Sequence, residues 1–144
     1  MIEGVKVEKV KLRVDERGRL VELFEEPGQV ILTTLFPGAI KGWHRHRRCA
    51  DTLVCVAGMV RLGVYDEREG SPTHGQLGEF FLGVHAPLRV HLPAGIWFGL
   101  KGIGPGEALV VVHKSLTHDP SDPDEERMDP QINEIPFDWE RRDK

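Results

Sequence analysis

The segment from residue 38 to residue 58, GAIKGWHRHRRCADTLVCVAG, constrains the fold of this chain more than any other. A glycine stands at each end, Gly38 and Gly58, and the residues between them form two runs that can each be extended. In a strand, residues two positions apart point to the same face, so His44 and His46 project together. The segment therefore predicts a strand, a turn and a second strand, as found in small β-barrels.

The two histidines need an explanation of their own. Two imidazoles on one face can ligate a metal, act as acid and base, or bind an anion, and the alternative is a solvated pair on an exposed strand. The run from Leu53 to Ala57 follows and is wholly apolar, as expected of a buried strand. Because a buried strand comes next, we interpret the pair as part of a site.

The rest of the chain is also patterned as strands. Glycine and proline separate the candidates, and no segment before residue 120 has a sustained helical period. We therefore predict an all-β barrel in a single domain, residues 1–144. The acidic, proline-containing segment 118–129 is expected to be a solvated connection, and residues 119–144 to close the barrel, anchored by Phe137 and Trp139. The predicted strands are 5–14, 20–24, 30–36, 53–56, 60–65, 80–82, 88–92 and 108–114.

Charge and composition exclude several classes of partner. A net charge of −4 without long basic runs argues against nucleic acid. One local positive cluster suits a small anion better. Charged and apolar residues alternate in the N-terminal segment, which contains no apolar stretch long enough for a signal peptide or a membrane span. We therefore expect a cytoplasmic protein. Its two cysteines, Cys49 and Cys55, are then expected to be reduced thiols. The cluster consists of Lys41, Arg45, Arg47 and Arg48.

Five segments, in order, resemble the dTDP-4-dehydrorhamnose 3,5-epimerases, which are dimeric enzymes of the cupin fold, a double-stranded β-helix or jelly-roll barrel. The most specific is DEREGSPTHG at 66–75, which is similar to the family's D-L-R-x-G-S-P-T-F-G. The others are DERGRLVELF at 15–24, GAIKGWH at 38–44, PAGIWFGL at 93–100, and MDP at 128–130 with the later Pro136. The resemblance spans most of the chain and implies the jelly-roll fold.

The resemblance also implies a reaction and its residues. Epimerisation beside a keto group removes a proton from carbon and returns it on the other face, which needs a base, an acid and a group that holds the enolate oxygen. By the resemblance, His44 is the base and Asp129 the carboxylate paired with it. The implied substrate is a dTDP-4-keto-6-deoxyhexose or similar nucleotide sugar, with no cofactor. The implied substrate contacts are Lys41, Gln29, Thr52, Arg17 and Glu22, of which the last two reach across a homodimer through an exchanged N-terminal strand.

Three departures from the family pattern leave the exact reaction open. The family's late-strand tyrosine, the acid on the opposite face, is absent, because the only tyrosine is Tyr65. Thr52 stands where the family has a lysine thought to hold the enolate, and Phe98 replaces a histidine. The second acid–base group is then His46, His113 or His118. The histidine pair also resembles the sugar 3,4-ketoisomerases, so the resemblance implies an epimerase or a ketoisomerase.

Two further interpretations come from other classes of protein. His44, His46 and Asp51 match the first metal motif of cupins, with aspartate in place of the usual glutamate, which favours a metalloenzyme as one alternative. A binding module that retains the sugar-nucleotide pocket without turnover is the other.

Overall fold

A computed structural model describes residues 1–143. It confirms the predicted all-β fold: these residues form strands and no α-helix, and therefore no helix that can cross a membrane. The strands are β1 (Lys6–Lys9), β2 (Leu12–Asp15), β3 (Gly18–Val21), β4 (Gln29–Leu35), β5 (Ile40–His46), β6 (Asp51–Ala57), β7 (Met59–Asp66), β8 (Leu77–Gly83), β9 (Leu88–Leu92), β10 (Ile96–Gly102), β11 (Ala108–Lys114) and β12 (Glu125–Arg127).

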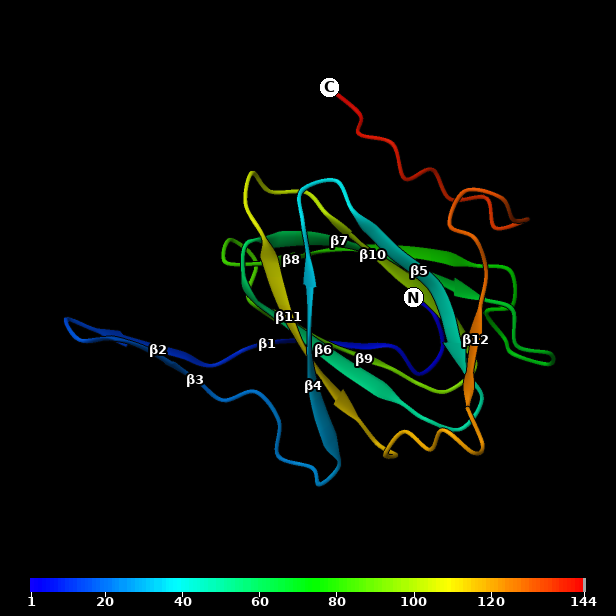
Figure 1. Ribbon diagram of the computed structural model, residues 1–144, viewed down its shortest axis with the longest axis horizontal. Helices are drawn as coiled ribbons and strands as arrows, with labels where there is room; N and C mark the ends of the chain where they lie inside the picture. Colours follow the sequence, from blue (N-terminus) through cyan, green and yellow to red (C-terminus); the bar gives the residue numbers. More distant parts are fainter. Residues whose placement is uncertain (144) are drawn as a thin grey trace.

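Two five-stranded antiparallel sheets face each other and enclose the core (Figure 1). We call them the β11 sheet, in the order β1-β9-β6-β11-β4, and the β10 sheet, in the order β12-β5-β10-β7-β8. Alternate residues of each strand point inward, as the pleat requires. The core between the sheets contains Leu53 and Cys55 of β6, Val110 and Val112 of β11, and Phe98 of β10. A residue two positions from one of these in the same regular strand therefore also faces the core, and an adjacent residue faces outward.

The 38–58 unit forms as predicted. Gly38 and Gly58, with φ of +79° and +71°, lie just before β5 and between β6 and β7. Glycine is favoured there because these backbone angles are strained for other residues. Both cysteines are free and buried, in agreement with the prediction of reduced thiols.

Several predicted strand boundaries are wrong. The predicted strand 5–14 is divided into β1 and β2, and the predicted strand 20–24 is replaced by β3, which ends at Val21. Strand β10 was not predicted, because its glycines and mixed side chains hide the alternation. Residues 125–127, expected within a solvated connection, instead form β12, an edge strand paired with β5.

The β2–β3 hairpin projects away from the two sheets (Figure 1). Leu12, Val14 and Leu20 are exposed on it. An isolated two-stranded hairpin is marginally stable in water, so this one has apolar surface available for contact with another molecule.

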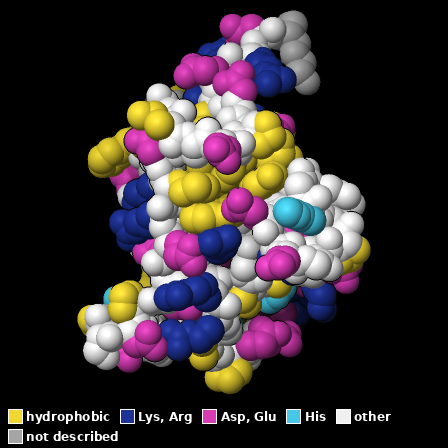
Figure 2. Space-filling model, turned by 90° about the vertical axis from the view of Figure 1, so that its right-hand side faces the viewer, with side chains coloured by type: hydrophobic (Ala, Val, Ile, Leu, Met, Phe, Trp, Pro, Cys, Tyr) yellow, Lys and Arg dark blue, Asp and Glu magenta, His cyan; other side chains and the backbone are white. Residues whose placement is uncertain are grey.

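The C-terminal segment covers the outer face of the β10 sheet. Phe137 and Trp139 pack there against Trp43. A Cβ added at Gly63 or Gly99 would lie 2.8 Å from Phe137 or 2.9 Å from Trp139, so the two glycines leave the room that the rings occupy. Figure 2 shows hydrophobic side chains gathered below the C-terminal end on this side of the molecule. The two aromatic residues anchor the tail, as the sequence predicts.

Candidate active site

Strand β5 places Lys41 and His44 on the same side of the sheet. Strict alternation would place them on opposite faces, since they are three positions apart. However, Phe98 pairs with His44 while Leu100, only two residues on, pairs with Lys41, so β5 contains one extra residue. Phe98 faces the core and lies against both His44 and His46, with ring centroids 5.9 and 6.2 Å apart. Both histidines therefore lie on one face, as predicted, and that face is the interior.

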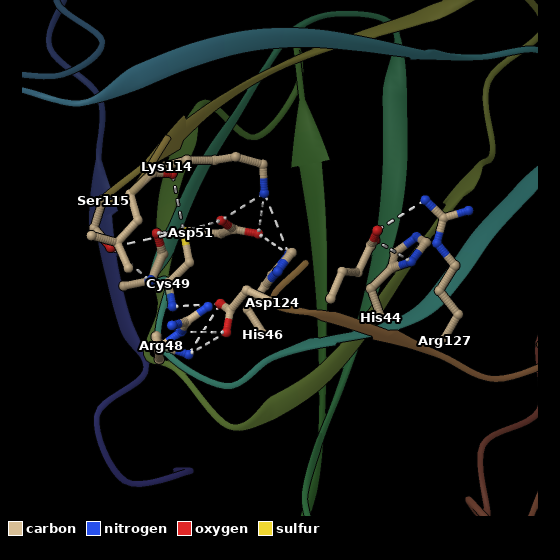
Figure 3. A network of polar contacts seen from close by, with 12 residues as sticks. His44, His46, Arg48, Cys49, Asp51, Lys114, Ser115, Asp124 and Arg127 are labelled. Atoms are coloured by element: carbon tan, nitrogen blue, oxygen red, sulfur yellow. Dashed lines mark hydrogen bonds and ion pairs between the residues drawn. The ribbon is translucent and has the colours of Figure 1, made fainter. Parts of the chain in front are cut away.

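The carboxylate beside His44 is Glu125, supplied by β12. Its Oε1 lies 3.0 Å from Nδ1 of His44, and the two side chains are 27% and 23% exposed. The contact is close but not aligned as a hydrogen bond, because Nδ1 of His44 has no hydrogen-bond partner. Glu125 is held from its other side by Arg127, whose Nη2 lies 2.9 Å from Oε2 (Figure 3). The arrangement orients a carboxylate at one ring nitrogen and leaves Nε2 for a substrate.

The environment favours a neutral His44. Burial lowers the pKa of His44 below its ordinary value of 6.5, and Glu125 opposes this only in part. Burial would raise the pKa of Glu125, but the hydrogen bond from Arg127 and the positive charge of Arg127 hold it below its ordinary value of 4.5. At neutral pH the pair is therefore an ionised carboxylate beside a neutral imidazole, which can accept a proton.

Asp129, the carboxylate that the resemblance assigned to His44, lies elsewhere. Its Oδ1 accepts hydrogen bonds from the backbone N–H groups of Gln131 and Ile132, at 2.8 and 2.9 Å. Among residues 1–143, no Asp129 oxygen lies within 4.0 Å of a His44 nitrogen. Short side chains of this type favour such turns, so Asp129 shapes the turn after β12 while Glu125 lies beside His44.

A second polar network contains His46, Asp51 and Lys114. Nε2 of His46 lies 3.2 Å from Oδ2 of Asp51 and 3.3 Å from Nζ of Lys114. Lys114 Nζ is also 3.1 and 3.3 Å from the two Asp51 oxygens (Figure 3). Burial would raise the pKa of Asp51, but His46 and Lys114 outweigh it and lower the pKa below 3.8. Asp51 is therefore an ionised, almost fully buried carboxylate.

The metal alternative does not fit this geometry. His46 and Asp51 are close, but the Lys114 ammonium contacts both of them and so takes the place that a cation would need. His44 pairs with Glu125 instead. Over the described chain, no three His, Cys, Asp or Glu side chains converge as a metal site would require.

Two predicted site residues lie on the outer face of the β11 sheet. Thr52 and His113 alternate with the core residues Leu53 and Val112, so they point outward. Thr52 Oγ1 lies 3.0 Å from Nδ1 of His91, and His113 Nε2 lies 3.2 Å from the carbonyl oxygen of Pro27. Both line an outer cavity of about 660 Å³ that does not include His44 or His46.

The remaining candidates differ in position. Lys41 lies on the same side of β5 as His44, where it is exposed, and it donates to Thr33 Oγ1 at 2.9 Å. Gln29 accepts through Oε1 from the backbone N–H of His118, whose side chain is exposed. Arg17 pairs with Asp15 at the turn of the β2–β3 hairpin, which projects away from the two sheets (Figure 1).

The predicted basic cluster is mostly neutralised. Arg45 contacts Glu126 at 2.6 Å, and Arg48 contacts Asp122 and Asp124 at 3.0 and 3.2 Å. Figure 2, which views this side of the molecule, shows basic and acidic side chains interspersed. The cluster is therefore not a general anion site, and Lys41 is its member on the same side of β5 as His44.

Glu125 and Lys114 are the residues that sequence reasoning missed. A signal existed for Lys114, because it continues the inward alternation of Val110 and Val112. For Glu125 there was none, since β12 has three residues and lies within an acidic segment.

Comparison with known proteins shows similarity along 96% of the chain. No protein-family model matches. The chain is 35% identical over 147 residues to the probable low-salt glycan biosynthesis epimerase Agl13 of Haloferax volcanii, covering 96% of this chain and 94% of the relative. The dTDP sugar isomerase of Desulfovibrio desulfuricans G20 is similar with a TM-score of 0.90 and 25% identity, over 96% of this chain and 92% of the other. NovW of Streptomyces spheroides, a 4-keto-6-deoxy sugar epimerase, gives 0.85 and 29%, over 96% and 75%.

Proposed function

We propose a reaction for this chain, which belongs to the dTDP-4-dehydrorhamnose 3,5-epimerase-like family of cupins and is a sugar epimerase. The proposed substrate is a dTDP-4-keto-6-deoxyhexose. Membership of the family rests on similarity over 96% of the chain, and the choice of substrate is supported by what the similar structures act on, a dTDP sugar and a 4-keto-6-deoxy sugar. The observation that carries the proposal is the half-buried His44, whose Nδ1 lies 3.0 Å from Oε1 of Glu125.

In this reaction His44 removes a proton from the carbon next to the keto group. Because Nδ1 faces Glu125, the proton goes to Nε2. The imidazolium that forms is then stabilised by the ionised carboxylate. The keto group is essential, since it accepts the electron pair of the broken C–H bond as an enolate oxygen. Lys41 supplies a positive charge for the diphosphate, and Gln29 lies on the facing strand β4.

Epimerisation is favoured over ketoisomerisation by the position of His46. A ketoisomerase that uses both histidines needs His46 free to exchange a proton with the sugar. Nε2 of His46 is instead 3.2 Å from Asp51 and 3.3 Å from Lys114. His44 is therefore the imidazole available to the substrate.

Incubation with dTDP-4-keto-6-deoxyglucose in heavy water tests the proposal. We expect deuterium at a carbon next to the keto group and a product inverted at that carbon, because the abstracted proton is replaced from solvent. Nuclear magnetic resonance distinguishes this product from one in which the keto group has moved. A sugar recovered without deuterium, or with a displaced keto group, would contradict the assignment.

We also propose a homodimer in which the β2–β3 hairpin packs on a second copy. Val14 of the hairpin is 69% exposed and would pack on Leu32 of the second copy, which is 59% exposed. Leu32 lies on β4, the edge strand of its sheet. Burial of both surfaces would stabilise the hairpin and carry Arg17, at its turn, to the partner.

Sedimentation equilibrium should accordingly give the mass of two chains. Val14→Glu places a charge in the proposed contact and should shift the mass toward one chain. Ile132→Glu alters an apolar side chain that is 82% exposed outside the hairpin, and should leave the mass unchanged. A wild-type protein with the mass of one chain rules the dimer out.

A further inference from the structure

Lys114 is the last residue of β11, and its side chain points into the interior. Its ammonium is enclosed by Asp51 of β6 and His46 of β5, and the Lys114 side chain is only 16% exposed. A buried ammonium is costly unless it is paired, and here the almost fully buried Asp51 provides the pair. Three strands thus hold one proton donor inside the barrel.

Lys114 and His44 project from opposite sheets. His44 belongs to the β10 sheet, through β5, and Lys114 to the facing β11 sheet (Figure 3). A flat enolate held between the two sheets would present one face to each residue. This is the relation that inversion of a carbon requires of its base and its acid.

Other candidates for the acid are excluded by position. Tyr65, the only tyrosine, packs in the aromatic cluster on the outer face of the β10 sheet. His113 is on the outer face of the β11 sheet, and Lys41 is on the same strand as His44. Among residues 1–143, Lys114 supplies an ammonium that points into the interior from the facing sheet.

We infer that Lys114 is the catalytic acid that returns the proton on the face opposite His44. This assignment rests on the proposed function. Lys114 Nζ lies 3.1 and 3.3 Å from the two oxygens of one carboxylate and 3.3 Å from Nε2 of His46, so these contacts can use two of its three N–H groups and leave one for the substrate. Asp51 and His46 position the ammonium.

The proton balance of the step is complete. His44 Nε2 takes the proton, the C–H bond breaks, and its electron pair forms the carbon–carbon double bond of the enolate. The enolate carbon then takes a proton from the Lys114 ammonium, whose N–H electron pair stays on nitrogen, and the carbonyl re-forms. His44 is left as imidazolium and Lys114 as amine, and exchange with water restores both.

The test separates inversion from exchange in the full-length protein, with dTDP-4-keto-6-deoxyglucose in heavy water. In Lys114→Met, inversion should fall at least about 100-fold. Deuterium incorporation at the same carbon, with retained configuration, should continue because His44 is intact. Lys101→Met is the matched control: Lys101 is also a part-buried strand lysine with a partner, the carbonyl of Trp139, but on the outer face, and both rates should persist.

Two outcomes overturn the assignment. Unchanged inversion in Lys114→Met means that another group is the acid. Loss of both inversion and exchange, with dTDP binding intact, means that Lys114 acts on the enolate oxygen instead. If the methionine variant does not fold, Lys114→Gln, which can still hydrogen-bond Asp51, is read in the same way. A wild-type enzyme that exchanges no proton refutes the proposed function and this assignment with it, whereas variant results against an active wild type refute the assignment alone.

Discussion

Replacing His44 with asparagine should lower proton exchange between the sugar and solvent roughly 100- to 10,000-fold, the usual contribution of a general base. Asparagine keeps a polar side chain beside Glu125 but cannot take a proton at neutral pH. The measurement is deuterium uptake by dTDP-4-keto-6-deoxyglucose. The melting temperature, measured in parallel, separates loss of the base from loss of the fold.

The pH dependence of the wild-type rate identifies the base independently. Because burial lowers the pKa of His44 below 6.5, exchange should continue at pH 6.5 and fall only as the pH drops through that lower value. Glu125→Gln removes an interaction that raises the pKa of His44, so the acid limb should move to still lower pH. Glu126→Gln is the control, because Glu126 pairs with Arg45. Full exchange in His44→Asn would remove His44 from the mechanism.

The sequence predicts the histidine strand well because its signals are local. Alternation places His44 and His46 on one face, and the glycines at 38 and 58 lie at the ends of the unit. The same alternation, applied to β11, already places Lys114 inward beside Val112. The same alternation places Thr52, which stands where the family has a lysine, on the outer face of the sheet.

The partner of His44 could not be predicted from local signals. Glu125 is distant in the sequence and reaches His44 only because three residues of an acidic segment pair with β5. Asp129 matched a family motif, yet its side chain is used by the backbone of its own turn. Pairing between distant segments depends on tertiary packing, which composition and periodicity do not contain.

Asp66→Asn should destabilise the fold by about 3 to 5 kcal/mol, as expected when one partner of a buried ion pair is removed. Asp66 has no exposed surface and pairs with Arg68, and it accepts hydrogen bonds from Ser71 and Thr73 at 2.7 and 2.6 Å. Arg68 also donates to the Glu3 carbonyl, so the network holds the N-terminus. The loss corresponds to a decrease of roughly 10 °C in melting temperature, measured by calorimetry.

The chain contains its own control for this effect. Asp15 and Arg17 repeat the contacts of Asp66 and Arg68, with backbone N–H to Oδ1 distances of 2.9 and 3.0 Å, but Asp15 is 46% exposed. Asp15→Asn should therefore leave the melting temperature close to that of the wild type.

Burial would raise the pKa of Asp66, but hydrogen bonds from Arg68, Thr73 and Ser71 hold it well below 3.8. A carboxyl group whose pKa is lower in the folded protein than in the unfolded protein stabilises the fold at pH values above the unfolded-state pKa. This stabilisation is lost as the pH falls toward the folded-state pKa. The difference between wild type and Asp66→Asn should be full at pH 6 and shrink below about pH 4, and a difference that does not change with pH would show that the charge of Asp66 is not its source.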